Sequence, residues 1–306
     1  MSSRVLDKPS LRVLSSDGYQ SASGLRVWRK GNGEAACLPF YFMPKETACV
    51  FIDGENLRHS LTDLFRPEFD PTDYLPRNGD WEGFFDDLVT RTGAQRRLRA
   101  YWYVVDEIEF WPYGLNRLSR DLTKLEAVLR KHPPYNQELQ RITDNGQRGI
   151  RARQLTQALL TRERQMKTRF EGWKVFQDGI CRRFDAIEFR RAGSIRYDLF
   201  RQTLGQEKSV DVNLATDLLE LRNIYDVGII VSGDQDYVPA VQAVKDSGKH
   251  IVNVSFLKRD GRILPGGARR LNQATDSVIE MAYADVHAFM RFPAPPAVAA
   301  SAVAAP

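Results

Sequence analysis

The chain has 306 residues and a mass of 35.0 kDa, which fits one large domain or two small ones with a substantial core. Apolar residues make up 42% and charged residues 27%, so wholesale disorder is not expected, and no apolar run approaches the roughly 20 residues that span a bilayer. The first 16 residues lack the apolar core of a secretory signal, and the three cysteines have no CxxC spacing. We therefore expect a cytoplasmic protein with no membrane partner, no disulfide framework and no structural zinc site.

The net charge of +5 is unevenly distributed along the chain. Residues 117–208 hold 21 Lys and Arg against 11 Asp and Glu, whereas the remainder holds 23 against 28. A basic segment beside acidic ones suggests that a polyanion is held near a site that collects cations. A solvated, arginine-rich helical face explains the basic segment equally well.

The character of the sequence changes near residue 48. Residues 1–47 mix polar stretches with short β-type pieces, and we expect an N-terminal arm whose role the sequence does not reveal. An apolar run over 48–52 that ends in Asp53-Gly54 then predicts a buried parallel strand. The following elements are expected to be a helix capped by Asp80, a strand over 98–105, and a helix over 114–131 that stops at His132-Pro133-Pro134.

The rest of the chain alternates between helical and strand patterns. Helices are expected at about 150–170, 210–222, 237–246 and 276–289, and strands at 184–191, 227–231 and 250–256. Such alternation predicts an α/β fold with a central parallel sheet and right-handed crossovers. The Ala/Pro-rich tail over 292–306 is expected to be disordered.

Two of the strongest predicted strands end in acidic polar clusters. Asp53-Gly54-Glu55-Asn56 follows the first, and Ser232-Gly233-Asp234-Gln235-Asp236 follows the strand over 227–231. Because ligands gather at the carboxyl ends of strands in open α/β sheets, Asp53, Asp211 and Asp234 converge on one rim if these strands are neighbours. Crowded carboxylates repel one another unless they are protonated or neutralised, and oxygen-only ligands suit Mg²⁺ or Mn²⁺.

Each cluster also has a plain structural explanation. Asp-Gly after a strand is a common turn, and Asp234 or Asp236 can simply cap the next helix. Asp217 lies six positions after Asp211, about 120° around a helix, so a regular helix cannot present both carboxylates to one ion. We therefore rank Asp211 above Asp217 as a metal ligand. Ser232 has no partnered histidine, which argues against a nucleophilic triad.

Four blocks in order carry a more specific signal: FIDGENLRHSL, KSVDVNLATDLLEL, IIVSGDQDYVPAVQAVKDSGKHIVNVSF and RRLNQATDSVIEM. Together they resemble the NYN family of PIN-like nucleases, and most closely its bacterial LabA-like branch. The resemblance implies a PIN-like three-layer sandwich over 48–291. It also marks about 107–208 as a basic helical insert that is longer than a minimal domain needs.

The resemblance further implies an acidic centre that binds Mg²⁺ or Mn²⁺ and cleaves RNA. The implied metal ligands and catalytic residues are Asp53, Asn56, Asp211, Asp234 and Asp236. Asn56 would hold the metal or a scissile phosphate oxygen. Asp217 and Ser232 would support the ligands from an outer layer.

Basic residues in the insert suggest a helical surface that grips RNA. They are Arg148, Arg151, Arg153, Arg162, Arg164, Lys167 and Arg169. Trp173, Phe176 and Tyr197 are candidates for stacking on bases, although core packing is the commoner use of each.

The leading hypothesis is therefore a metal-dependent endoribonuclease that uses metal-activated water. The alternative is a non-catalytic regulator that binds nucleic acid or protein through the same fold. A third reading is a metal phosphohydrolase for a small phosphate ester, against which the basic insert argues. The sequence leaves open whether the RNA is single-stranded or structured, whether DNA is cut, whether one or two ions bind, and whether the chain forms a homo-oligomer.

Overall fold

The computed structural model describes residues 28–29, 35–36, 46–66, 75–118, 120–265 and 268–292. The chain divides into two compact units, Met1–Pro44 and Lys45–Pro306. In the first unit, β1 (Trp28–Arg29) and β2 (Ala35–Ala36) pair antiparallel. The other residues of the predicted arm before 46, and the predicted disordered tail after 292, lie outside the described residues.

The second unit is built on an eight-stranded sheet, seven strands of which follow the order β10-β8-β7-β3-β4-β5-β6. These strands are β3 (Thr47–Asp53), β4 (Arg96–Trp111), β5 (Ile187–Asp198), β6 (Thr203–Lys208), β7 (Val227–Val231), β8 (His250–Leu257) and β10 (Ser277–Ala282). Only β6, on β5, and the short β9 (Ile263–Leu264), on β8, pair antiparallel. The predicted α/β class with a central, largely parallel sheet is confirmed.

The central strand β3 shows why this sheet is buried on both faces. Its side chains alternate between two cores, with Val50 and Ile52 in one and Cys49 and Phe51 in the other. A continuous apolar run therefore serves both faces at once, as is typical of parallel strands under helices. Strand β7 follows the same rule, with all five residues buried.

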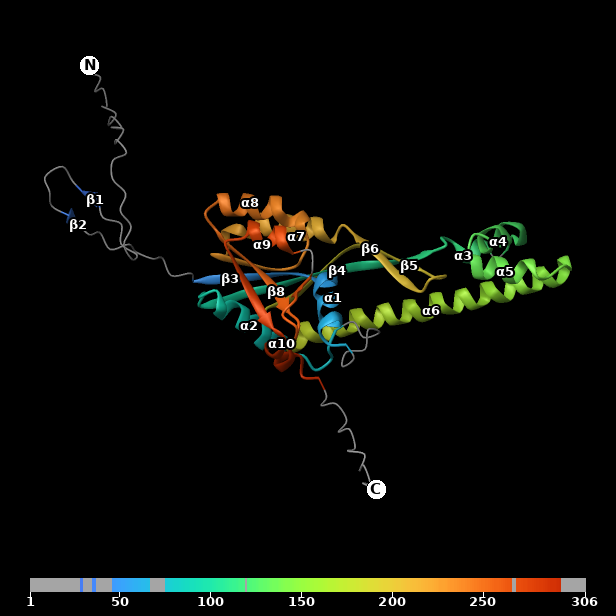
Figure 1. Cartoon of the computed structure of the whole chain (residues 1–306), viewed down its shortest axis with the longest axis horizontal. Helices are drawn as coiled ribbons and strands as arrows, with labels where there is room; N and C mark the ends of the chain where they lie inside the picture. The colour runs from blue at the N-terminus through green and yellow to red at the C-terminus, as the bar shows by residue number, and fades with distance from the viewer. Residues whose placement is uncertain are drawn as a thin grey trace, which may run out of the picture. The chain divides into compact units, whose positions relative to one another are not determined.

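Helices cover both faces of the sheet (Figure 1). The core of one face takes residues from α1 (Gly54–Leu64), α2 (Trp81–Arg91), the end of α6 (Asn145–Arg183), and α10 (Tyr283–Met290). The core of the other takes them from α7 (Val210–Glu220), α8 (Val238–Asp246) and α9 (Arg269–Ala274). Two 3₁₀ turns, η1 (Leu221–Asn223) and η2 (Gln235–Tyr237), adjoin α7 and α8. Among the described residues, no helix has the length and apolar character needed to cross a bilayer.

The final predicted helix over 276–289 is wrong in its first half. Residues Ser277–Ala282 form β10, which pairs parallel with β8, and the helix begins only at Tyr283. Ile279 and Met281 are buried while their neighbours Glu280 and Ala282 are exposed, which is the alternation of an edge strand. The apolar residues in this segment also fit a helical spacing, and that coincidence produced the error.

The predicted helix over 114–131 is also interrupted. It divides into α3 (Leu115–Leu118) and α4 (Leu122–Leu129), because the Asp121 carboxylate accepts the Lys124 backbone N–H and starts a new helix. A further helix, α5 (Pro133–Gln140), begins at the prolines where the pattern predicted only a stop, since proline suits a first helical turn. The helix predicted over 150–170 extends over Asn145–Arg183.

Helices α3 to α5 and the first half of α6 form a separate arm. Its small core contains Leu125, Leu129, Leu139, Leu159 and Leu199. Figure 1 shows these helices packed at the N-terminal end of α6, where β4 and β5 also extend. Strands β5 and β6 fall within the predicted insert of about 107–208 but pair with the main sheet, and the domain limits stay a prediction.

The two faces of α7 give a direct test of this packing. Leu214 is fully buried in the core that contains Phe51, whereas Val212 is 67% exposed. We expect Leu214→Ala to lower the free energy of unfolding by about 2–5 kcal/mol, because it leaves a cavity. Val212→Ala should change it by less than about 0.5 kcal/mol. Chemical denaturation of both variants measures the difference, and equal losses would contradict this orientation of α7.

Candidate metal centre

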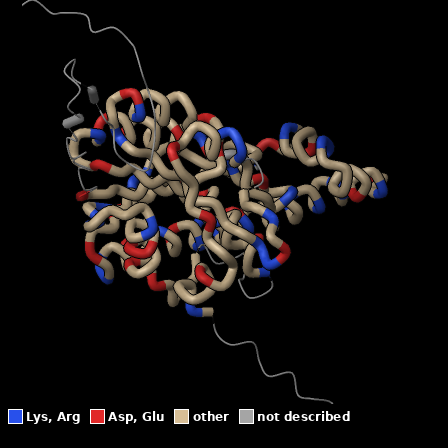
Figure 2. Tube along the Cα trace, turned by 60° about the vertical axis from the view of Figure 1, so that its left-hand side comes forward, with Lys and Arg blue, Asp and Glu red and all other residues tan. Residues whose placement is uncertain are grey.

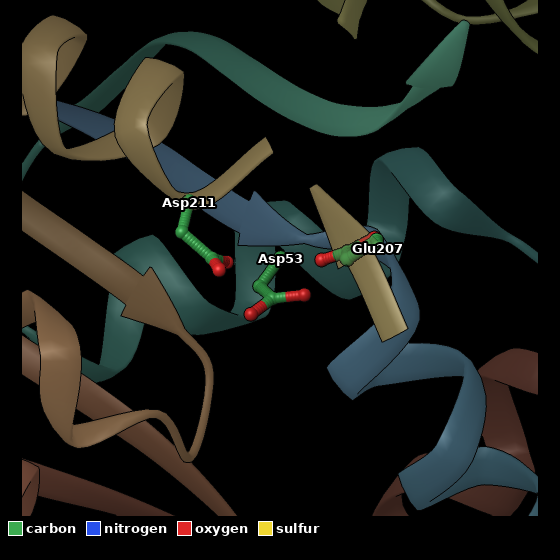
Figure 3. Close-up of side chains that lie close together, drawn as sticks. All are labelled: Asp53, Glu207 and Asp211. Carbon is green, nitrogen blue, oxygen red and sulfur yellow. The ribbon is translucent and has the colours of Figure 1, made fainter. Parts of the chain in front are cut away.

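The neighbouring strands β3 and β7 bring two polar segments to the same edge of the sheet. They pair in parallel with Ile52 opposite Val231, so Asp53 and Ser232 leave the sheet side by side. On one side, α7 begins beside this edge and carries Asp211 in its first turn. Figure 3 shows that the side chains of Asp53, Asp211 and Glu207 point toward one another.

Asp53 is the buried carboxylate of the cluster and is held by several hydrogen bonds. It is 0% exposed and caps α1, since its Oδ1 accepts the Asn56 backbone N–H at 3.0 Å. Its Oδ2 accepts the Asn56 side-chain amide at 2.6 Å and the Ser232 hydroxyl at 2.9 Å. A Cβ on Gly54 would lie 2.5 Å from the carbonyl oxygen of Tyr103, so only glycine lets α1 begin this close to β4.

A buried tyrosine links Asp53 to Asp211. The Tyr237 hydroxyl lies 3.2 Å from Asp53 Oδ2 and 2.8 Å from Asp211 Oδ1. Burial, followed by the two carboxylate charges, raises the pKa of Tyr237, so its proton stays available as a donor. The hydroxyl has one proton, so it donates to only one of the two carboxylates at any moment, while Asp53 keeps its hydrogen bonds from Asn56 and Ser232.

Glu207 completes the cluster and was missed in the sequence. Each of Asp53, Glu207 and Asp211 offers a carboxylate oxygen, and these three oxygens lie within 4.8 Å of one another. Glu207 Oε2 is buried and has no hydrogen-bond partner among the described residues. Gly193 has φ +63°, and a Cβ there would lie 1.8 Å from the Lys208 carbonyl oxygen, so glycine permits the close approach of β6 that positions Glu207.

The pKa values of all three carboxyl groups are raised. Burial, then the charges of Asp53, Glu55 and Asp211, raise the pKa of Glu207 to about 9. Burial raises the pKa of Asp53 to about 6, against the effect of its hydrogen bonds. Burial also raises the pKa of Asp211, with the charges of Asp234 and Asp236 adding to the effect. The cluster therefore carries more negative charge than its surroundings stabilise.

The donor set of this cluster fits a hard divalent cation. Three carboxylates without histidine or cysteine match the oxygen preference of Mg²⁺ and Mn²⁺. The unpartnered oxygen of Glu207 is the observation that favours a ligand over a self-contained polar network, because a buried acceptor without a donor is costly. The nearby arginine Arg58 is bonded to Glu55 at 2.8 Å.

The other predicted site residues, which follow β7, lie beside the cluster. Asp234 accepts the Asp236 backbone N–H at 2.9 Å and so caps η2, while its own N–H donates to Ser232 Oγ at 3.1 Å. Asp236 is exposed. The negative charges of Asp234 and Asp236 both help to raise the pKa of Asp211. Neither carboxylate belongs to the group of three whose oxygens lie within 4.8 Å of one another. Their predicted metal contact stays a prediction.

Asp217 has other partners. Its carboxylate accepts the Tyr103 hydroxyl at 2.8 Å and forms an ion pair with Arg190. This places it against β4 and β5 on the sheet side of α7 rather than in the cluster. Helical spacing predicted its separation from Asp211, whereas nothing in the sequence revealed its partners.

The predicted RNA-binding residues divide into two groups along α6. Three of them brace the arm: Arg148 contacts Glu126 at 3.4 Å, Arg151 pairs with Glu138, and Arg162 donates to the Tyr135 hydroxyl at 3.0 Å. The remaining four are exposed and have no ion pair among the described residues. They are Arg153, Arg164, Lys167 and Arg169. Figure 2 shows the Lys and Arg positions distributed along this projecting part of the molecule.

Comparisons with known proteins agree with the four sequence blocks in part. A model of the NYN domain family matches residues 164–282, a range that contains Glu207, Asp211 and Asp234 but not Asp53. A solved structure of a protein of unknown function from Vibrio parahaemolyticus is similar over 78% of this chain and 94% of its own, with 15% identity and a TM-score of 0.35. No curated protein matches the chain, and the LabA-like branch stays a prediction.

The raised pKa of Glu207 predicts how stability changes with pH when no metal is added. The unfolded group loses its proton near its ordinary value of 4.5, but the folded group holds it up to about 9. Its contribution to stability is therefore complete at low pH and is lost as the pH rises toward 9. We expect the melting temperature in EDTA to fall between pH 6.5 and 8.5, a window above the raised pKa of Asp53, which is about 6.

Glu207→Gln removes the titrating group and keeps the shape of the side chain. Its melting temperature should change less over the same pH window, as measured by calorimetry. Adding Mn²⁺ at pH 8 should raise the melting temperature of the wild-type chain more than that of the variant. The role given to Glu207 would be contradicted if the melting temperatures of the wild-type chain and of the variant changed equally with pH in EDTA and rose equally with Mn²⁺.

Proposed function

We propose that this chain is a metal-dependent endoribonuclease that hydrolyses phosphodiester bonds in RNA. The proposal is supported by the match of the NYN domain model, from the PIN-like superfamily, to residues 164–282. The observation that carries the proposal is the meeting of Asp53, Glu207 and Asp211 with their oxygens within 4.8 Å. The negative charges of its members raise one another's pKa values, so the cluster does not by itself stabilise the packed fold.

Three carboxylates would hold the ion, namely Asp53, Glu207 and Asp211. A bound Mg²⁺ or Mn²⁺ supplies charge neutralisation at a phosphate and a water of lowered pKa. Asp234 and Asp236 are the acids beside this group, and we propose that they orient water around it. Asn56 holds Asp53 through its amide nitrogen and accepts the Gly233 N–H at 3.3 Å through its oxygen, so it ties the two strand ends together.

RNA is the proposed polyanion. NYN nucleases act on RNA, and the exposed side of α6 offers Arg153, Arg164 and Lys167 without ion-pair partners among the described residues. A small phosphate ester would need no such extended positive surface. We also propose the cytoplasm as the compartment, a proposal that rests on the lack of any cysteine pairing pattern.

The first test of the proposal is the removal of one metal-binding charge. Asp53→Asn keeps a helix-capping side chain, so the fold should persist, but it weakens the hold on the ion. We expect cleavage of a labelled single-stranded RNA in Mn²⁺ to fall on the order of 100-fold or more. Asp211→Asn should behave alike, and EDTA should abolish cleavage by the wild-type chain.

The matched control is Glu220→Gln, which removes an exposed charge from the same helix as Asp211. It should cleave at the wild-type rate. Undiminished cleavage by purified Asp53→Asn protein would eliminate the proposed centre. RNA binding by a wild-type chain that cleaves no RNA or DNA with either metal would support the non-catalytic regulator instead.

A second test concerns the basic side of α6. Combined charge reversal of Arg153, Arg164 and Lys167 removes three phosphate contacts that have no competing ion pair among the described residues. We expect the slope of log affinity against log salt to become shallower by about 2 for single-stranded RNA. Filter binding at several salt concentrations measures this slope. Arg262→Glu, on the exposed loop after β8, is the control, and an unchanged slope in the triple variant would refute the gripping role.

A further inference from the structure

A pocket of about 700 Å³ is lined mainly by residues of α6 and of the segment before α2, and its lining does not include the three carboxylates. Its walls are residues 75–81, which lead into α2, and the C-terminal half of α6. This volume falls in the range of ligand sites in proteins, which runs from about 300 to 1,000 Å³. Nothing in the metal centre accounts for it.

Aromatic rings and arginines line this pocket together. Trp173, Phe176 and Phe184 are half-buried, so each packs on the core with one part and faces the pocket with another. Three exposed arginines also contribute to the lining: Arg77, Arg169 and Arg183. Among the described residues that line the pocket, none is acidic. A flat aromatic group that carries negative charge matches these walls.

Two glycines in the C-terminal half of α6 add no side chain to this wall of the pocket. Gly172 and Gly179 are seven residues apart, almost two helical turns, and therefore lie on the same face. A Cβ at either position would meet no heavy atom within 4 Å, so packing within the chain does not require glycine. Alanine would favour the helix at both positions, because glycine weakens a helix interior. Their absent side chains leave space that a ligand can use.

We propose that this pocket binds an unstacked nucleobase of single-stranded RNA, with the flanking phosphates on the arginines. The inference rests on the proposed function, since it takes RNA as the ligand, and it adds the form of RNA that is recognised. Base stacking on aromatic side chains tolerates any sequence, because every base has a π face. A base inside a duplex stays stacked and cannot enter, so the pocket selects single strands.

A second copy of this chain is the main competing occupant. A purely apolar groove would suit it, but the exposed Arg169 and Arg183, in a lining with no acidic residue among those described, favour a polyanion. The same argument disfavours an apolar peptide or lipid chain. The oligomeric state is therefore part of the test.

The test measures binding of a fluorescent single-stranded 12-nucleotide oligouridylate to the full-length chain in EDTA, where cleavage does not interfere. We expect Phe176→Leu, which keeps an apolar side chain but removes the ring, to weaken binding about five- to tenfold. The Gly172→Ala/Gly179→Ala variant should weaken binding similarly while its melting temperature is unchanged or higher, so loss of folding cannot explain the effect. Ile150→Ala, an exposed apolar change on the same helix, is the control.

Photocrosslinking locates the base directly. An oligouridylate with one 5-iodouridine should crosslink to a peptide within 169–184 or 75–84, and its duplex should not. Wild-type affinity of both the Phe176 and the glycine variants would overturn the inference, as would crosslinks elsewhere. A wild-type dimer that dissociates in the Phe176 variant would overturn it too, in favour of a second copy. Binding that depends on the pocket without any cleavage in Mn²⁺ would defeat only the proposed nuclease activity.

Discussion

Repulsion among three clustered carboxylates, one buried and two half-buried, is the interaction on which the candidate site depends. Asp53, Glu207 and Asp211 would each be more stable in water, and burial raises the pKa of every one of them. The surrounding donors, chiefly Tyr237 and Ser232, stabilise Asp53 and Asp211 but leave Glu207 without a partner among the described residues. A bound cation is the simplest way to offset this cost, and the proposed chemistry uses the same ion.

The three carboxylates come from three kinds of local structure. Asp53 ends a central strand and caps a helix, Asp211 lies in the first turn of another helix, and Glu207 belongs to an antiparallel strand at the sheet edge. Close backbone approaches at Gly54 and Gly193 allow these elements to meet. The site is therefore a property of the assembled sheet, and the pocket on α6 adds a separate surface of opposite charge.

The parts of the fold that the sequence predicted are those with strong local signals. Strands β3 and β7 are continuous apolar runs, and their pairing brings Asp53 next to Ser232. Glu207 was missed because its position depends on the register between β5 and β6, which has no local signature. Strand β10 was mistaken for a helix because its few apolar residues fit both periods. The local sequence pattern therefore identified the polar residues at the ends of strands. It did not identify Glu207, which a strand distant in the sequence brings to them.

Strand β6 is paired on one side only, and Glu207 is held in place by that single ladder with β5. Edge strands open at lower free energy than central ones. Opening this hairpin would move Glu207 away from Asp53 and Asp211, which belong to other elements, and would take away one of the three carboxylates that would hold an ion. Because Leu199, directly after β5, packs in the core of the helical arm, the strand that holds Glu207 in place is also part of the connection between the arm and the sheet.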